Sequence, residues 1–194
     1  MANEYTRIVD LGETLSTGAA PGKKLVARDG GYVLSRDGAW VVVLRDGRAQ
    51  VDSGGRAEVW DGGMATVGLN GRADVYNGGV AEVYDGGSAD VHSGGRAEII
   101  KGGIGSILPG GRATVHAGGE ATVGSGGYVD VKNRGKAIIH EGGEATVYDG
   151  GLAIVNDGGV ALVCAGGEAT VHPGGKATGT GRIVKYGGKK GGRQ

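Results

Sequence analysis

From residue 30 onward, hydrophobic and polar positions alternate within units of eight residues. Counting from Gly30, the fourth residue of a unit is small and usually Ala, and the sixth is Val or Ile in seventeen of nineteen units. The third, fifth and seventh positions accept almost any side chain. This period of two predicts one short strand in each unit, with Ala and Val pointing inward and the variable side chains pointing outward.

Glycine marks the corner that follows each strand. The second residue of the unit is Gly in eighteen of nineteen units, Ala39 being the exception, whereas Asp46, Asn70 and Arg134 replace the first Gly. A sharp turn that recurs in every unit requires positive φ or a close backbone approach, and Gly tolerates both. We therefore assign the stricter dihedral requirement to the second Gly.

A lone strand of this length cannot bury its Ala and Val face, so the units must stack into a coil with a continuous interior. The sequence predicts an all-β, parallel β-solenoid (β-helix) over residues 30–181. We expect residues 1–29, where Ile8 and Val9 indicate a strand, to form an N-terminal cap or an attachment segment. We expect residues 182–194 to form a closing strand and a flexible basic tail.

The outward positions indicate how many units make one turn of the coil. The heptamer Gly-Gly-Glu-Ala-Thr-Val-x begins at residues 118, 142 and 166, so its copies are three units apart. We predict a three-faced solenoid with about 24 residues per turn and about six turns, hence a rod of about 30 Å at the usual strand spacing. A two-sided coil, with two units per turn, would scramble these columns. The same three-unit spacing aligns Arg48, Arg72, Arg96, Glu120, Glu144 and Glu168 on a solvated wall.

On the second of the three predicted faces, apolar residues are concentrated among scattered charges. An exposed apolar sheet face is typical of a surface that contacts a copy of the same chain or another protein, although β-propensity alone also enriches such residues in strands. An apolar face sealed by a polar rim would indicate assembly, and a shallow aromatic and acidic groove would indicate glycan binding. The predicted interface residues are Trp60, Val80, Tyr84, Ile104, Leu108, Tyr128, Leu152 and Ile154.

Two patterns raise the question of metal binding. The three-unit period places His92, His116, His140 and Cys164 in one column, whose nitrogen and sulfur atoms suit zinc. Asp-Gly-Gly turns at Asp61, Asp85, Asp149 and Asp157 invite comparison with calcium-binding repeats. Duplication alone also produces such His columns, and Asp before a turn also hydrogen-bonds locally. We expect no metal or other cofactor.

Composition narrows the function classes. The 46 Gly residues and the absence of Phe leave only a thin core of small side chains. The 21 basic residues balance 21 acidic ones, which gives no case for nucleic acid as a partner; Lys189, Lys190 and Arg193 form a local basic cluster. A single cysteine, Cys164, excludes an intrachain disulfide. We expect no signal peptide, no membrane insertion and no catalytic residues.

The repeat Gly142-Gly143-Glu144-Ala145-Thr146-Val147 resembles the glycine-rich repeats of AIDA-type autotransporter adhesins and the solenoid segments of phage virion proteins. The resemblance covers residues 30–181 and implies a non-enzymatic, surface-displayed scaffold. Adhesin repeats of that type are longer, and an autotransporter needs a signal peptide and a C-terminal membrane barrel. A virion protein needs neither.

The leading hypothesis is therefore a phage virion component, a minor tail, fibre or capsid-associated protein made in the host cytoplasm. Its expected partners are other virion proteins and copies of itself. One alternative is an adhesin or receptor-binding module that contacts a host-surface glycan or protein. The other is a cytoplasmic, self-polymerising scaffold similar in principle to bactofilins.

Overall fold

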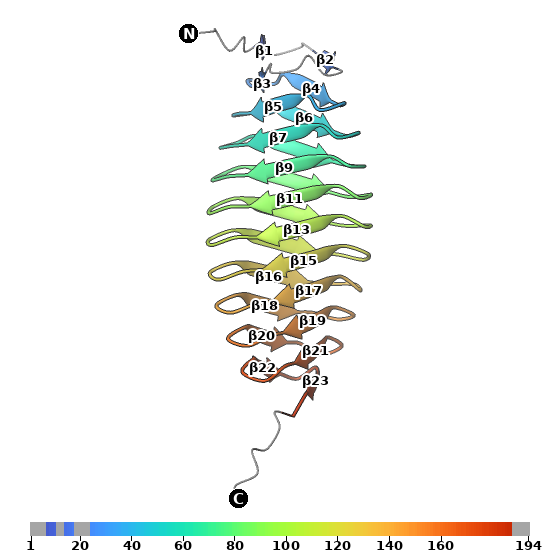
Figure 1. Ribbon diagram of the computed structural model, residues 1–194, viewed down its shortest axis with the longest axis vertical. Helices are drawn as coiled ribbons and strands as arrows, with labels where there is room; N and C mark the ends of the chain where they lie inside the picture. Colours follow the sequence, from blue (N-terminus) through green and yellow to red (C-terminus); the bar gives the residue numbers. More distant parts are fainter. Residues whose placement is uncertain (1–6, 11–13, 18–23, 188–194) are drawn as a thin grey trace, which may run out of the picture.

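The computed structural model describes residues 7–10, 14–17 and 24–187, and all the regular elements among them are strands of two parallel sheets. Successive strands alternate between the sheets, which stack along one long axis from β1 and β2 to β22 and β23 (Figure 1). The twelve-stranded sheet, here the odd-strand sheet, contains β1 (Arg7–Val9), β3 (Lys24–Ala27), β5 (Trp40–Val43), β7 (Arg56–Val59), β9 (Arg72–Val75), β11 (Ser88–Val91), β13 (Ile104–Ile107), β15 (Glu120–Val123), β17 (Lys136–Ile139), β19 (Leu152–Val155), β21 (Glu168–Val171) and β23 (Arg182–Lys185). The eleven-stranded sheet, here the even-strand sheet, contains β2 (Thr14–Thr17), β4 (Tyr32–Ser35), β6 (Arg48–Val51), β8 (Met64–Val67), β10 (Val80–Val83), β12 (Arg96–Ile99), β14 (Arg112–Val115), β16 (Tyr128–Val131), β18 (Glu144–Val147), β20 (Val160–Val163) and β22 (Lys176–Gly179).

Strand pairing sets the coil at two units per turn, one on each sheet. Arg56 of β7 is in register with Arg72 of β9, and Met64 of β8 with Val80 of β10. The all-β parallel solenoid is confirmed, but the predicted three faces, three-unit turn and six turns are wrong. Twelve strands at about 4.8 Å spacing give a rod of about 50 Å instead of about 30 Å.

The error has a physical reason. The inward pattern repeats in every unit, so it fits a coil of two units as well as a coil of three. The outward residues that recur in every third unit are not constrained by packing, and their recurrence records sequence similarity between units instead of coil geometry. Arg48 and Arg72, for example, lie on opposite sheets.

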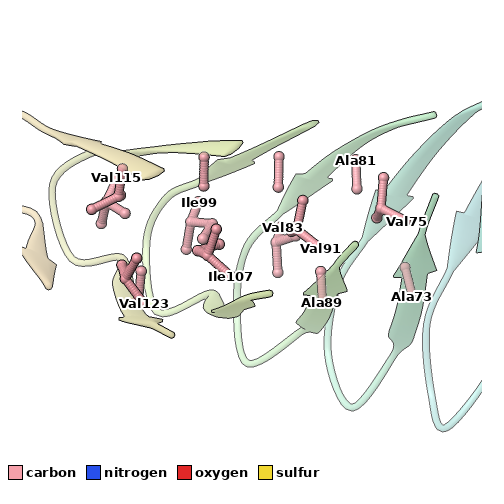
Figure 2. Close-up of a cluster of buried hydrophobic side chains, with 14 of the residues drawn as sticks. Ala73, Val75, Ala81, Val83, Ala89, Val91, Ile99, Ile107, Val115 and Val123 are labelled. Atoms are coloured by element: carbon pink, nitrogen blue, oxygen red, sulfur yellow. The ribbon is translucent and has the colours of Figure 1, made fainter. Parts of the chain in front are cut away.

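The interior is a thin layer of Ala and Val between the two sheets, as the alternation predicted. Ala57, Val59, Ala81 and Val83 are all fully buried, and the same holds along the rod (Figure 2). Because consecutive strands run in opposite directions across the interior, the Ala of one strand faces the Val of the next. Most pairs of facing residues therefore combine a small side chain with a larger one, Val33, Val41 and Val129 being the larger fourth-position residues.

One unit shows how closely this pairing is matched in volume. In β13 the inward small residue is Gly105, and it faces Ile99 of β12, which is larger than the usual Val. A Cβ built on Gly105 would overlap the Cδ1 atom of Ile99. The extra methyl group of Ile99 therefore fills the space that an Ala would occupy at residue 105.

The corners are four-residue turns whose two central residues are the eighth and first of the repeat. In one corner the amide of Gly63 donates to the carbonyl of Trp60 at 2.7 Å, which closes the turn. The first position adopts positive φ, 72° at Gly62, and also 56° where Asn70 replaces Gly. The left-handed dihedral therefore belongs to the first Gly of the pair, and our assignment of it to the second was wrong.

The second Gly is required because of a close backbone approach. A Cβ at Gly119 would overlap the carbonyl oxygen of Ile99 in the preceding coil, and one at Gly63 would stand only 2.5 Å from that of Val43. Each of these two carbonyls is part of the hydrogen-bond ladder between coils, so it cannot move away from an added Cβ. A side chain at Gly63 or Gly119 would therefore clash with the backbone, and Ala39 near the N-terminal end is the one residue with a side chain that this position holds in the repeat.

Both ends of the rod continue the same two sheets. β3 pairs with β5 and β1 with β3, so strands within the predicted cap or attachment segment belong to the solenoid. The expected closing strand is present as β23, which pairs with β21. Residues 1–6, 11–13 and 18–23 of the N-terminal segment lie outside the described residues, as do residues 188–194 with the predicted basic tail.

We predict that Gly119→Val lowers the melting temperature far more than Glu120→Val. The added Val side chain would displace the Ile99 carbonyl from the inter-coil ladder, at a cost above about 3 kcal/mol, or roughly 6–12 °C. Glu120 is exposed, and the same substitution there should stay within about 0.5 kcal/mol. Thermal unfolding followed by circular dichroism measures both. Equal melting temperatures would contradict the corner geometry.

Val123→Asp should likewise disrupt its coil, because the carboxylate would stand unpaired in the Ala and Val interior. The adjacent Thr122 points outward, so Thr122→Asp serves as the matched control and should leave the protein folded. Hydrogen exchange of the amides in β13, β15 and β17 reports the local loss of protection. A Val123→Asp protein as protected as the control would mean that the inside and outside of the sheet are reversed.

Candidate contact surface

The outer face of the odd-strand sheet carries an apolar strip near its C-terminal end. Ile138 of β17 and Leu152 and Ile154 of β19 lie on adjacent strands, and Ile104 of β13 extends the strip toward the N-terminus. Their exposed fractions are 38%, 39%, 40% and 53%, whereas the inward residues of the same strands are almost fully buried. We call these four residues the apolar strip.

The apolar strip borders a groove of about 520 Å³ that runs across β13 to β21. Side chains at the third and fifth positions of the repeat form its two walls. Its floor is the backbone at Ala121, Ala137 and Ala153, where the side chain points inward and leaves the outer surface low. Thr122 and Thr170 also line it. The groove is thus a direct result of the period of two in each strand.

Four charged residues, here called the charged rim, lie along the third-position edge of the strip: Glu120 and Lys136 between Ile104 and Leu152, and Glu168 and Arg182 beyond Leu152. Lys136 Nζ lies 3.4 Å from Glu120 Oε1, and Arg182 Nη1 donates to Glu168 Oε1 at 2.7 Å. Lys136 and Glu168 are on the two strands next to β19, so Leu152 has a cation on one side and a carboxylate on the other. Exposed ion pairs of this kind contribute little to stability.

The structure divides the predicted interface residues between the two sides of the rod, which corrects the expected single face. Ile104, Leu152 and Ile154 lie together on the odd-strand sheet, and Trp60 and Leu108 follow odd strands at the corner. Val80 and Tyr128 belong to β10 and β16 of the even-strand sheet, and Tyr84 follows β10. The cause is the two-unit turn, because positions three units apart fall on opposite sheets.

Sequence reasoning missed Ile138, which completes the apolar strip, and the exposed Val160 and Leu162 on β20 of the even-strand sheet. The signal that would have found Ile138 is the spacing of two units between Ile138 and Ile154, both at the fifth position of the repeat.

The predicted column of His92, His116, His140 and Cys164 does not exist. His92 and His140 follow the odd strands β11 and β17, whereas His116 and Cys164 follow the even strands β14 and β20 at the other corner. Three coils separate His92 from His140, about 14 Å along the rod. Within the described ranges, no three His, Cys, Asp or Glu side chains group as a metal site would require.

The Asp-Gly-Gly turns are divided in the same way. Asp61 and Asp157 lie at the corner after odd strands, six coils apart, whereas Asp85 and Asp149 lie at the corner after even strands, four coils apart. A calcium ion needs six to eight oxygen ligands around it. These four carboxylates are too far apart to share one ion.

An aromatic stack follows the odd strands at one corner. The ring centroids of Trp60 and Tyr76 are 4.0 Å apart, and those of Tyr76 and His92 are 4.4 Å apart, with the planes within 15° of parallel. The three residues stand at the same position of every second unit and so occupy successive coils. Tyr76 lies between the other two rings, so both of its faces are in contact with an aromatic neighbour. A sugar that stacks on aromatic faces would find those of Tyr76 already covered.

Diagonal side-chain contacts connect successive coils on both outer faces. Arg56 Nη2 donates to Asp74 Oδ2 at 2.8 Å, and the Tyr128 and Thr146 hydroxyls are 2.7 Å apart. Each runs from the third position of one strand to the fifth position of the next strand in the same sheet. Arg72 with Asp90 and Tyr32 with Gln50 follow the same rule. We call these contacts the diagonal links.

Comparison with solved structures finds a similar chain in the crystal structure of a TibC-catalyzed hyper-glycosylated TibA55-350 fragment. The two share 25% sequence identity, and the alignment covers 94% of this chain and 92% of that chain with a TM-score of 0.38. That score is too low to establish a common topology, so the fold described above rests on the strand pairing of this chain. No protein-family model and no curated protein matches it.

The described ranges contain no helix of the length and hydropathy needed to cross a membrane.

The pKa of Tyr128 predicts how the stability of the folded protein changes at alkaline pH. Burial raises the pKa of Tyr128 above its ordinary value of 10, and so does the hydrogen bond that its hydroxyl donates to Asp130 at 2.9 Å. The stabilisation of the folded state that this pKa shift supplies is complete at pH values below the unfolded pKa of Tyr128, near 10. It is lost as the pH rises through the folded pKa, because between the two pKa values the native state holds more protons than the unfolded chain.

We therefore expect the melting temperature of the wild-type protein to fall as the pH rises above the ordinary tyrosine pKa of 10. Tyr128→Phe should lower the melting temperature at neutral pH and flatten part of the alkaline fall. Thermal scans at closely spaced pH values measure both effects. An alkaline profile of Tyr128→Phe parallel to that of the wild type would contradict the assignment.

Proposed function

We propose that this chain is a non-enzymatic structural protein of a phage particle, a minor tail, fibre or capsid-associated component that packs against a neighbouring protein through its odd-strand sheet. The observation that carries the proposal is the apolar strip with its charged rim. An exposed apolar surface with charged residues along its edge is typical of an assembly interface, where the apolar part excludes water and the charged edge remains solvated.

The architecture suits a load-bearing role. Every inward position of the central strands is filled by Ala, Val, Ile or Gly, and the strands of each sheet are hydrogen-bonded to neighbours along the rod. A solenoid of this kind holds its surface residues at fixed spacing, since each coil is tied to the next on both sheets. Such a rod can space or orient other components without any moving part.

The choice of a phage particle is supported by the resemblance of the Gly-Gly-x-Ala-x-Val repeat to solenoid segments of virion proteins. An apolar groove with a charged rim favours assembly over glycan recognition. The stacked faces of Trp60, Tyr76 and His92 favour the same choice, because glycan binding uses open aromatic faces. The adhesin and polymer alternatives therefore come second.

Gradient sedimentation of particles tests this role. Particles released from cells that carry the gene are banded by density and probed with an antibody against the solenoid. We expect the wild-type chain in the particle band and at a fixed place by immunogold microscopy. Ile154→Lys should greatly reduce incorporation, because it places a charge in the centre of the apolar strip.

Leu162→Lys is the matched control. Leu162 occupies the same repeat position on β20 of the even-strand sheet and is 50% exposed, so this variant should be incorporated normally. A wild-type chain that remains entirely in the soluble fraction would overturn the virion role. A chain found on the cell surface instead would support the adhesin alternative.

A further inference from the structure

Along the odd-strand sheet, the charges of the third-position side chains follow an order in which each charge meets an opposite one when the row is laid against its own reverse. Leu152 of β19 is at its centre. One strand away on either side stand Lys136 and Glu168, and two strands away stand Glu120 and Arg182. Each residue on one side of Leu152 thus has a residue of opposite charge at the same distance on the other side.

We propose that the partner of this surface is a second copy of the chain, packed face to face and antiparallel, with a two-fold axis parallel to the strands at β19. This inference rests on the assembly role proposed above and names its partner. The two-fold axis reverses the order of strands and keeps the position along each strand. Lys136 therefore faces Glu168 of the second copy, and Glu120 faces its Arg182, while Leu152 and Ile154 meet their own copies.

The proposed packing buries apolar groups at the axis and pairs the charges around it. Sheets that pack face to face stand about 10 Å apart, a distance that two apolar side chains or an extended Lys–Glu pair can bridge. The innermost charges, Lys136 and Glu168, are only one strand spacing from the axis. They therefore remain aligned even if the two rods cross at the angle of about 30° usual for packed sheets.

Shifted registers are disfavoured by like charges. An axis at β17 would place Lys136 against its own copy, and one at β21 would place Glu168 against its own copy. An axis midway between β17 and β19 would place Glu120 opposite Glu168, and one midway between β19 and β21 would place Lys136 opposite Arg182. A more distant register, with the axis midway between β15 and β17, escapes like charges near the axis, since Glu120 would face Lys136 and Ile104 would face Leu152 of the second copy. It places a charge pair at the centre and Glu168 opposite Ser88, so Glu168→Lys would leave that dimer almost unchanged. Among these registers, the axis at β19 is the one that combines an apolar centre with opposite charges on both sides.

A parallel pair is also less favourable. A two-fold axis along the rod would place the third position of each strand opposite the fifth position of the same strand in the second copy. Lys136 would then face Ile138, and Glu168 would face Thr170, so neither charge would have an opposite partner. The antiparallel arrangement is therefore the one that the outward residues specify.

The size of the surface predicts a weak dimer. Five strands at about 4.8 Å spacing, each about 13 Å long, give a flat area of about 300 Å² on each copy. A standard interface buries about 800 Å² on each partner. The self-association must therefore be measured at high concentration, up to about 1 mM, the range of low-area complexes.

Charge reversal tests the register by sedimentation equilibrium on the full chain. Lys136→Glu should weaken dimerisation about tenfold or more, because it opposes Glu168 of the second copy with a like charge. Glu168→Lys should weaken it in the same way against Lys136. The double variant with both changes restores opposite charges across the interface, and its dissociation constant should return to within a few-fold of the wild-type value.

Three comparisons keep this test independent of folding. The side chain of Lys136 is 61% exposed and that of Glu168 is 35% exposed, and both point outward from the sheet, so thermal scans should show both reversals folded. Ile154→Lys should be monomeric without altering any charge pair. Leu162→Lys on the even-strand sheet should dimerise like the wild type.

The proposal fails if the wild-type chain is monomeric at the highest concentration, if the double variant stays as weak as the single ones, or if Leu162→Lys abolishes the dimer. These outcomes are separate from those of the particle experiment. A monomer that still bands with particles would remove the dimer and leave the structural role. A dimer that is absent from particles would remove the structural role in the particle and leave the dimer.

Discussion

The structure depends on how closely one coil approaches the next at its corners. In all units but the one with Ala39, the second residue is a Gly that lies against a backbone carbonyl of the preceding coil, with no room for a Cβ, as at Gly119 and Ile99. This contact brings the corners into hydrogen-bonding distance, and the Gly62 amide donates to the Gly78 carbonyl of the next coil, followed by Gly78 to Gly94. The strands between the corners then fall into register without a large core. A chain without Phe can therefore fold around an interior of Ala and Val.

The same constraint explains why the repeat is strict inside and permissive outside. Inward side chains must fit those of the facing strand, and at one pair the larger Ile99 stands opposite Gly105. Outward side chains contact only other outward side chains, mostly on neighbouring strands, and these contacts include Arg with Asp, Tyr with Thr, and aromatic stacks. The outer face is thus free to carry charge patterns that serve a partner.

Sequence reasoning reached the strands, their inward residues and the parallel solenoid, because period-two alternation and corner Gly residues are imposed locally. It could not fix the number of strands per turn, since Ala and Val at positions four and six suit either geometry. The error then spread to every property that depends on which residues share a face. Of the predicted interface residues, Ile104, Leu152 and Ile154 do lie together, but Tyr84 and Tyr128 lie on the other side of the rod. The predicted column of His and Cys residues was wrong for the same reason.

The diagonal links all lean in one direction, from the third position of a coil to the fifth position of the next. Arg56 with Asp74 and Tyr128 with Thr146 lie on different sheets, yet they share this slant. A rotation of one coil against the next in one sense lengthens such links, and the opposite rotation slackens them. We therefore expect the rod to resist torsion more in one sense than in the other, as a rope twisted in one direction does.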